Sequence, residues 1–206
     1  MSALSRAALI KRLRAGDLII SPILDALQLG PSSIDLRMGT VALMARAGAQ
    51  SHVDPSAYLK QHQHRTLRDR QQKHERFDIP FGKSFLLHPG SLILVPTFEW
   101  IKLPFDLQGV VTARSSWARE GLNIATATIV NPLYRGIVTL ELANFGEIPI
   151  RLSPGLRLAQ IALYNLEGAS IGAPQSTTAQ FDMSFEPSAG NIASGDEVFA
   201  RSPLLQ

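Results

Sequence analysis

A short basic segment and one carboxylate later in the chain carry the residue types needed for chemistry on a phosphorylated molecule. Residues 114–119 read Arg-Ser-Ser-Trp-Ala-Arg, with two hydroxyl groups between two guanidinium groups. Free backbone N–H groups at the start of a helical turn bind anions, and guanidinium groups match phosphate oxygens in a fork geometry. We therefore predict that this segment grips phosphate. The alternative for Ser115 and Ser116 alone is an ordinary helix cap.

The carboxylate is Glu141, within the apolar run Gly-Ile-Val-Thr-Leu-Glu-Leu at residues 136–142. Apolar neighbours desolvate a carboxylate and raise its pKa, which makes it a better proton acceptor near neutral pH. The alternative is an ordinary outward-facing residue of an alternating strand. A phosphate grip together with a base predicts chemistry on a phosphorylated small molecule.

Short strands must position these groups. Ser5 caps a predicted helix that ends at Gly16, and after it short apolar runs bounded by Gly and Pro dominate. The runs lie at residues 18–20, 33–37, 84–87, 91–95, 109–112, 137–142, 148–152 and 158–164. Many short strands separated by turn residues are typical of an all-β barrel or sandwich. We therefore predict a mainly β protein with few helices.

The 206 residues, 45% of them hydrophobic and 18% charged, fit one soluble globular domain. No run reaches the roughly 20 apolar residues of a membrane span. The first residues lack the apolar core of a secretory signal, and the chain has no cysteine. We expect a cytoplasmic protein that does not bind membranes. The composition of residues 168–206, rich in Ser, Ala, Gly and Pro, indicates an extended tail.

The net charge of +3 is distributed unevenly. Residues 60–76 hold six Lys or Arg against two acidic residues, so this window carries +4 and the rest of the chain −1. A patch for nucleic acid or another anionic ligand would explain the window, and so would a solvated insertion between two strands. No aromatic residue lies between Tyr58 and Phe77 to stack on bases, which favours the insertion over a nucleic-acid site.

The order of the segments resembles the dCTP deaminase and dUTPase superfamily, and dCTP deaminase most. The stretches that carry the resemblance are 29–39, 85–104, 114–119, 131–136, Glu141 and 152–160. The resemblance implies a distorted jelly-roll subunit of the dUTPase-like, β-clip type with an N-terminal helix. It also implies a homotrimer whose active sites lie at subunit contacts. Residues 1–167 would form the nucleotide-binding domain, with the basic window 60–76 as an insertion.

Roles for single residues follow from the same resemblance. Glu141 is the implied catalytic glutamate, Ser115 helps to hold the catalytic water, and Arg119 contacts phosphate and steadies Glu141. The implied ligand is a nucleoside triphosphate with Mg²⁺, which is bound through the phosphates and not by protein ligands. Tyr134 stacks on deoxyribose, or else only packs in the core. The implied substrate-binding residues together are Arg114, Ser115, Ser116, Arg119, Thr128, Asn131, Tyr134, Thr139 and Leu140.

Deamination of cytosine needs a water activated for attack on C4 and a proton for the departing ammonia. Nucleobase deaminases commonly activate that water on zinc held by Cys and His. This chain has no cysteine, and none of its five histidines lies in an H-x-E pattern. We therefore predict metal-free hydrolytic deamination of dCTP to dUTP and ammonia, without zinc. The implied partners are a deoxycytidine nucleotide and further copies of the chain.

Two alternative functions stay open. A dUTP diphosphatase of this superfamily uses an Asp to hold the attacking water where this chain has Asn131, and an amide is not a useful base near neutral pH. A catalytically impaired, trimeric nucleotide-binding regulator is the other alternative. The segment 125–128 is shortened, and the tail lacks the sequence that closes deaminase sites. Phe181, Phe185 and the stretch 188–191 are candidates for a substitute lid.

Overall fold

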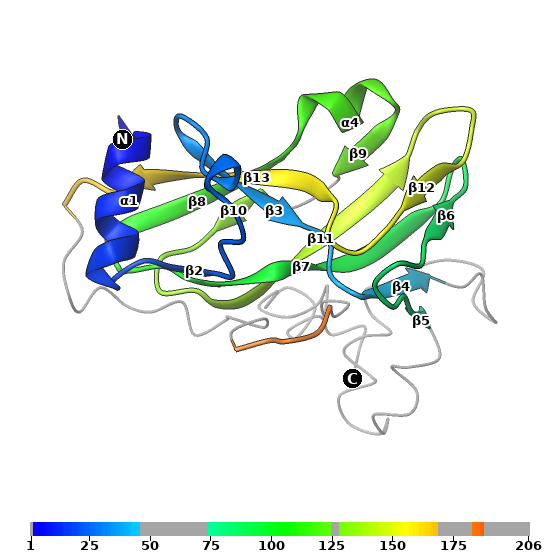
Figure 1. Ribbon diagram of the computed structural model, residues 1–206, viewed down its shortest axis with the longest axis horizontal. Coiled ribbons are helices and arrows are strands. Elements are labelled where there is room, and N and C mark those ends of the chain that lie inside the picture. The colour runs from blue at the N-terminus through cyan, green and yellow to red at the C-terminus, as the bar shows by residue number, and fades with distance from the viewer. Residues whose placement is uncertain (1, 46–73, 125–127, 169–182, 188–206) are drawn as a thin grey trace, which may run out of the picture.

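The computed structural model describes residues 2–45, 74–124, 128–168 and 183–187, and it consists mainly of short strands, as predicted. The strands run along an elongated molecule, with α1 (Arg6–Ala15) at one end and β6 (Phe85–Leu87) and β12 (Ile150–Leu152) toward the other (Figure 1). Two very short helices accompany them, η1 (Ala26–Gln28) and α4 (Ser115–Arg119). Within the described ranges, no helix is long and apolar enough to cross a membrane.

Local capping explains the bounds of α1. The Ser5 hydroxyl accepts a hydrogen bond from the backbone N–H of Ala8 (3.4 Å). Gly16 has φ 77°, and its N–H donates to the carbonyls of Arg12 and Leu13. A left-handed residue that satisfies the last carbonyls is the usual end of a helix, and glycine adopts that conformation without strain. The predicted helix is therefore confirmed, and its Leu9 is fully buried in the core.

The first sheet is centred on β13 (Arg157–Asn165). On one side β13 pairs with β8 (Leu107–Ala113), which pairs in turn with β10 (Ile129–Val130). On its other side lie β3 (Ser33–Arg37) and β1 (Ser2–Ala3). Alternate residues of these strands point into the core, where the side chains of Ile34, Leu36, Ile161 and Leu163 are fully buried.

The second sheet is built on the two longest strands, β7 (Leu92–Lys102) and β11 (Arg135–Asn144). β4 (Val41–Ala45) and β5 (His74–Asp78) extend it beyond β7, β9 (Leu122–Ile124) extends it beyond β11, and β2 (Ile19–Ser21) pairs with the far end of β7. A third ladder joins β6 to β12. All eight predicted runs contain strands, whereas β1, β4, β5, β9 and β10 were not predicted. β5 takes up the end of the basic window, whose residues 60–73 lie outside the described part.

An irregularity in the β7 and β11 pair changes the register beside the candidate site. Ile137 pairs with Trp100 but Thr139 pairs with Pro96, so β7 contains extra residues at this point. Pro96 has no N–H, so it cannot donate a backbone hydrogen bond to β11. The Val138 N–H of β11 donates to the Thr97 hydroxyl (2.9 Å) and not to a backbone carbonyl of β7. Such bulges bend a strand and redirect the side chains that follow. Thr139 and Glu141 follow it on β11.

The side chain of Glu99 is fully buried in β7 and is held by a polar cluster. Its carboxylate accepts hydrogen bonds from the backbone N–H of Arg37 (2.7 Å), from the guanidinium of Arg37 (3.1 Å) and from the amide of Gln28 (2.9 Å). Burial raises the pKa of Glu99, and the bonds from Arg37 oppose that rise. Arg37 also pairs with Asp25, the N-cap of η1 (2.9 Å). The cluster thereby ties β3, β7 and η1 together.

Removing Arg37 should be strongly destabilising, because it leaves the Glu99 carboxylate buried without its cation. We expect Arg37→Met to lower the free energy of unfolding, measured by urea denaturation, by about 3–5 kcal/mol. Adding Glu99→Leu should restore part of that loss, since removing both charges costs less than removing one. Arg6→Met is the control: it removes an exposed guanidinium bonded to the Ala26 carbonyl and should cost less than about 1 kcal/mol. An equal loss in both single variants would contradict this role of Arg37.

Candidate active site

The predicted phosphate-binding segment forms α4, directly after β8. Arg114 is the N-cap, and its carbonyl accepts hydrogen bonds from the backbone N–H groups of Trp117 (3.0 Å) and Ala118 (3.2 Å). Ser115 and Ser116 form the exposed first turn, so the alternative in which the serine pair caps the helix is wrong. Their hydroxyls lie where a helix leaves its first N–H groups without intrahelical partners, which suits an anion.

Backbone contacts hold the start of α4 against β13. The Arg114 N–H donates to the Leu158 carbonyl (3.0 Å), and the indole N–H of Trp117 donates to the Arg157 carbonyl (3.0 Å). Both acceptors lie at the beginning of β13, which is fixed between β3 and β8. The orientation of α4 therefore depends on the first sheet.

The turn after α4 packs backbone to backbone against the turn that follows β11. Gly121 has φ 87°, and a Cβ at this position would lie 2.7 Å from the backbone nitrogen and 2.8 Å from the Cα of Gly146. Its carbonyl accepts a hydrogen bond from the Phe145 N–H (2.9 Å). A side chain at residue 121 would meet both an unfavourable backbone conformation and this contact. The connection between α4 and β9 is thus pinned to the end of β11.

Glu141 lies on β11 opposite Leu94 of β7, one residue before β11 begins to pair with β9 at Leu142. Leu140 and Leu142 are fully buried in the core, so the intervening Glu141 points away from it, as the outward-facing alternative requires. The side chain is nevertheless half-buried, and burial raises the pKa of its carboxyl. The desolvation predicted from the apolar run is therefore confirmed.

Residues 131–134 form the turn that leads into β11. Asn131 is exposed, and Leu133 has φ 65°, a conformation uncommon for a residue other than glycine. Tyr134 is half-buried against the core, and its hydroxyl donates to the Ile137 carbonyl. One side of the Tyr134 ring therefore packs against the core, and the hydrogen bond of its hydroxyl fixes the orientation of the ring.

The remaining predicted binding residues differ in what they can offer a ligand. The Thr128 carbonyl accepts the Val111 N–H (2.7 Å), while the residue itself is exposed. Thr139 is half-buried and lies on the same side of β11 as Glu141. The Leu140 side chain is fully buried in the core, so only its main chain is available. Residues 125–127, which precede Thr128, lie outside the described part.

The structure gathers the predicted residues into two groups. The first is α4 with its N-cap Arg114, and the second is β11 with Glu141 and the turn before it. β9 connects them, because it follows α4 in the chain and pairs with β11 at residues 142–144. No ion pair joins Arg119 to Glu141 within the described part of this single chain. The predicted contact between these two residues stays a prediction for an assembled site.

A segment near the C-terminus, residues 183–187, lies along the start of β11. The sequence indicated Phe185 of this segment as a lid candidate but not its pairing with β11. The Met183 N–H donates to the Arg135 carbonyl, the Ile137 N–H donates to the Ser184 carbonyl (3.0 Å), and Ser184 forms a parallel bridge with Gly136 (Figure 1). Glu186 of this segment pairs with Arg76 of β5 (2.8 Å). The side chain of Phe185, a lid candidate, is 70% exposed. The other candidates, Phe181 and residues 188–191, lie outside the described residues.

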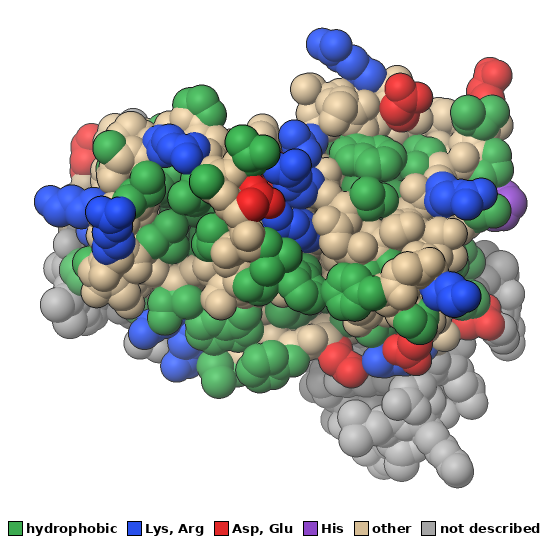
Figure 2. Space-filling view, viewed as in Figure 1, with side chains coloured by type: hydrophobic (Ala, Val, Ile, Leu, Met, Phe, Trp, Pro, Cys, Tyr) green, Lys and Arg blue, Asp and Glu red, His purple; other side chains and the backbone are tan. Residues whose placement is uncertain are grey.

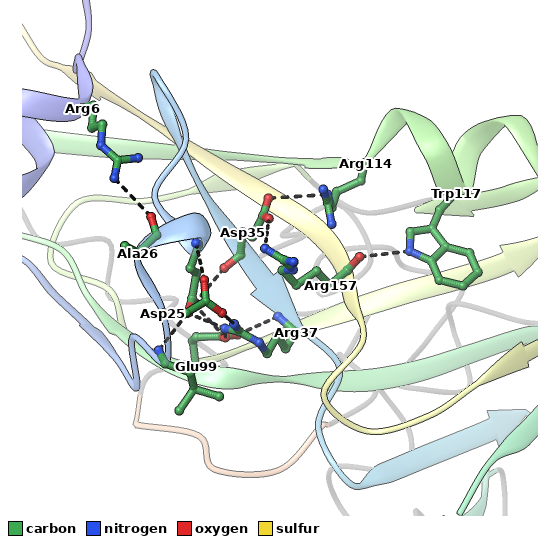
Figure 3. Close-up of polar contacts among 11 residues, drawn as sticks. Arg6, Asp25, Ala26, Asp35, Arg37, Glu99, Arg114, Trp117 and Arg157 are labelled. Atoms are coloured by element: carbon green, nitrogen blue, oxygen red, sulfur yellow. Dashed lines mark hydrogen bonds and ion pairs between the residues drawn. The ribbon is translucent and has the colours of Figure 1, made fainter. Parts of the chain in front are cut away.

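Two charged residues from the stretches that carried the family resemblance, Asp35 and Arg157, lie beside Arg114. Figure 3 shows Asp35 of β3 between the side chains of Arg114 and Arg157. On the face of the molecule that is turned to the viewer in Figures 1 and 2, basic side chains gather in a central band with apolar areas on either side (Figure 2). Asp35 and Arg157 are 122 positions apart in the chain, so only the pairing of β3 with β13 brings them together. No local pattern in the sequence could have indicated this contact.

A small hollow of about 180 Å³ lies beside α4. It is lined by Ala113, Ala118, Gly121, Leu122, Asn123, Ile124 and Phe145. Small-molecule sites usually enclose roughly 300–1,000 Å³. The hollow is therefore smaller than a complete nucleotide site.

A family model described as dCTP deaminase-like matches residues 3–166. The chain belongs to the dCTP deaminase-like family. The family resemblance predicted from the order of the sequence segments is thus confirmed. The dUMP-forming dCTP deaminase of Dictyoglomus thermophilum is 40% identical over 158 residues, which cover 76% of each protein. A dCTP deaminase of Halorubrum lacusprofundi is 36% identical over 166 residues, which cover 80% of this chain and 77% of that protein.

The fold matches a solved structure of a dCTP deaminase-like protein. The crystal structure of the 2′-deoxycytidine 5′-triphosphate deaminase from Agrobacterium tumefaciens superposes with a TM-score of 0.59 at 24% sequence identity. The match covers 78% of this chain and 47% of that chain. This chain therefore spans about half the length of the Agrobacterium protein, and the likeness concerns the fold.

The raised pKa of Glu141 predicts how stability depends on pH. Because the folded-state pKa lies above the ordinary value of 4.5, ionising this group penalises the folded state. The contribution of Glu141 to unfolding free energy should be largest below pH 4.5 and should fall as pH rises through the folded-state pKa. We expect the difference in unfolding free energy, wild type minus Glu141→Gln, to fall over this window. Urea denaturation at a series of pH values measures it, and a difference that rises with pH would contradict the desolvation argument.

Proposed function

We propose that this protein deaminates dCTP and that Glu141 is the general base. The observation that carries the proposal is a half-buried carboxylate of raised pKa on β11, in a chain of the dCTP deaminase-like family. Relatives of 40% and 36% identity are named dCTP deaminases, and each is matched over more than three quarters of its length. A carboxylate whose pKa is raised by burial is better matched to proton transfer near neutral pH than an exposed one.

The reaction needs a proton acceptor and a proton donor at the same position. Glu141 takes a proton from water as the oxygen attacks C4 of cytosine, a C–O bond forms, and the electron pair of the C4–N3 double bond moves to N3. Glu141 then returns the proton to the C4 amino group, the electron pair on N3 re-forms the double bond as the C–N bond breaks, and ammonia leaves. Transfer of the C4 hydroxyl proton to N3 gives uracil. In this proposal the Ser115 hydroxyl helps to hold the water, and Arg119 stabilises the ionised carboxylate of Glu141.

Substrate binding is assigned to both groups of the site. Arg114, Ser115, Ser116 and Arg119 contact the triphosphate, and the exposed first turn of α4 supports this role. The nucleoside is assigned to the β11 group, with deoxyribose against Tyr134 and the base near the exposed Thr128 and Asn131 and the main chain of Thr139 and Leu140. Among the described residues, no cluster of three or more His, Asp or Glu side chains could hold a metal ion. We assign Mg²⁺ to the phosphate oxygens, where it would neutralise their charge.

We also propose the distorted jelly roll, the homotrimer and the cytoplasmic location. The trimer is supported by one observation on the single chain: the hollow beside α4, at about 180 Å³, is small for a nucleotide. A partner subunit would supply the missing wall. The division into a nucleotide-binding domain at 1–167 and a tail at 168–206 stays a prediction. Residues 169–182 and 188–206 of the tail are not described.

The predicted product needs a correction. The sequence indicated dUTP, whereas relatives such as those of Dictyoglomus thermophilum and Methanobrevibacter smithii are named dUMP-forming. Formation of dUMP from dCTP requires cleavage of the triphosphate in addition to deamination. These names favour triphosphate hydrolysis as a second candidate activity of the same site. Residue 131, which the superfamily uses to hold the attacking water in that reaction, is the position at which to test it.

Deamination is tested by the release of ammonia from dCTP. Wild type should release it, and Glu141→Gln should lower kcat by about 10²–10⁴-fold, the usual contribution of a general base. The matched control is Glu147→Gln, an exposed glutamate in the turn after β11, which should keep wild-type activity. Tight binding of dCTP without ammonia release by wild type would sink the proposal and identify a nucleotide-binding regulator.

Triphosphate hydrolysis is tested by the release of diphosphate from dUTP. An amide cannot accept the proton of an attacking water, so Asn131→Asp should release diphosphate at least about tenfold faster than wild type. The same variant should change ammonia release from dCTP little, because Glu141 is retained. Equal diphosphate release by both proteins would show that any hydrolysis proceeds without residue 131.

A further inference from the structure

Asp35 lies between two arginines at the start of α4 and β13. Its Oδ1 is 3.6 Å from the Nε of Arg114, and its Oδ2 is 3.5 Å from a terminal nitrogen of Arg157 (Figure 3). The Asp35 side chain is 13% exposed, whereas the two arginine side chains are about one-third exposed. One enclosed carboxylate therefore contacts two guanidinium groups that both reach solvent.

The backbone of Asp35 is fixed from the interior. Its carbonyl accepts a hydrogen bond from the amide of Gln28 (3.0 Å), and the same amide nitrogen bonds the carboxylate of Glu99 (2.9 Å). Gln28 and Glu99 are fully buried, and Asp35 also pairs with Gln160 of β13. The main chain of Asp35, and with it the base of its side chain, is therefore held by both the buried cluster and the first sheet.

The contact with Arg114 leaves the phosphate-binding end of that side chain available. Asp35 faces the Nε of Arg114, and the terminal amino groups of Arg114 make no hydrogen bond with any described residue. Those amino groups are the part of a guanidinium that binds two phosphate oxygens at once. Contact at Nε therefore restricts the side chain without occupying its binding groups.

Asp35 also offsets repulsion between the two arginines. The three side chains together carry one positive charge, and without the carboxylate two like charges would face each other across the start of α4. Arg157 supports the same helix through its carbonyl, which accepts the indole N–H of Trp117. Displacement of either arginine would therefore disturb the segment that presents Ser115 and Ser116.

We propose that Asp35 is a positioning residue for the phosphate site: it orients the guanidinium of Arg114 toward the triphosphate and holds Arg157 beside it. This inference rests on the proposed function in assigning Arg114 to phosphate. The inference predicts the direction in which anion affinity changes when the Asp35 charge is removed, and simple charge counting predicts the opposite direction. Removing a negative charge next to an anion site should strengthen anion binding, whereas losing an orienting contact should weaken it.

The test is the binding of inorganic tripolyphosphate with Mg²⁺, measured by isothermal titration calorimetry on the full chain. Asp35→Asn keeps the shape of the side chain and removes the charge, and we expect a dissociation constant about fivefold to tenfold higher than that of wild type. The matched control is Asp106→Asn, which disrupts the ion pair of Asp106 with Arg12 (2.6 Å) on another part of the molecule. It should leave the dissociation constant unchanged.

Two further measurements separate positioning from a purely structural role. In steady-state deamination of dCTP, Asp35→Asn should raise KM by the same factor and change kcat less than about twofold. In an Arg114→Met background, Asp35→Asn should have no additional effect on tripolyphosphate binding. A structural role would instead give additive losses that follow the thermal midpoint. If Asp35→Asn does not fold, Asp35→Ser serves the same comparison.

Unchanged or tighter binding of tripolyphosphate by the Asp35 variant would overturn the proposal, and so would additive losses in the Arg114→Met background. Absence of tripolyphosphate binding by wild type would overturn it as well. The proposed function fails separately. If wild type binds tripolyphosphate in an Asp35-dependent way but releases no ammonia from dCTP, the positioning role holds and the deaminase assignment does not.

Discussion

The structure depends on the neutralisation of one carboxylate that has no access to water. Glu99 lies fully buried in β7, and an isolated charge there would be too costly to keep. Arg37 and Gln28 come from two other elements to satisfy it, and the N-cap Asp25 pairs in turn with Arg37. β3 and η1 are thereby placed against β7, which is the central strand of the other sheet. This requirement and the apolar core together hold the two sheets against each other.

The two groups of the candidate site, α4 with Arg114 and β11 with Glu141, are positioned by the strands that this cluster connects. β3 lies beside β13, which supports α4 through the carbonyls of Leu158 and Arg157. β7 lies beside β11, which carries Glu141 on the face opposite its buried leucines. α4 thus depends on the first sheet, and the carboxylate of Glu141 belongs to the second. In the proposed function a nucleotide spans these two groups, with its phosphates at α4 and its base near β11.

Features that depend on neighbouring residues in the chain could be predicted from the sequence. The caps Ser5 and Gly16 gave the bounds of α1, and apolar runs between turn residues gave most strands. β5 was missed because His-Glu-Arg-Phe-Asp is a polar stretch at the end of a basic window. The burial of Glu141 was predictable from its apolar neighbours. The contact of Asp35 with Arg114 and Arg157 was not, because it depends on strand pairing, and neither was the pairing of Ser184 with β11.

The contact between the turns at Gly121 and Gly146 limits how this protein can change. A Cβ atom on Gly121 would lie 2.7–2.8 Å from backbone atoms of Gly146, so the two turns leave no room for a side chain at residue 121. The position of the turn after α4 is then set by backbone atoms, whereas α4 itself is also held through the Trp117 side chain, which packs against the core. A methyl group at residue 121 would have a larger effect than many changes made deep inside the protein.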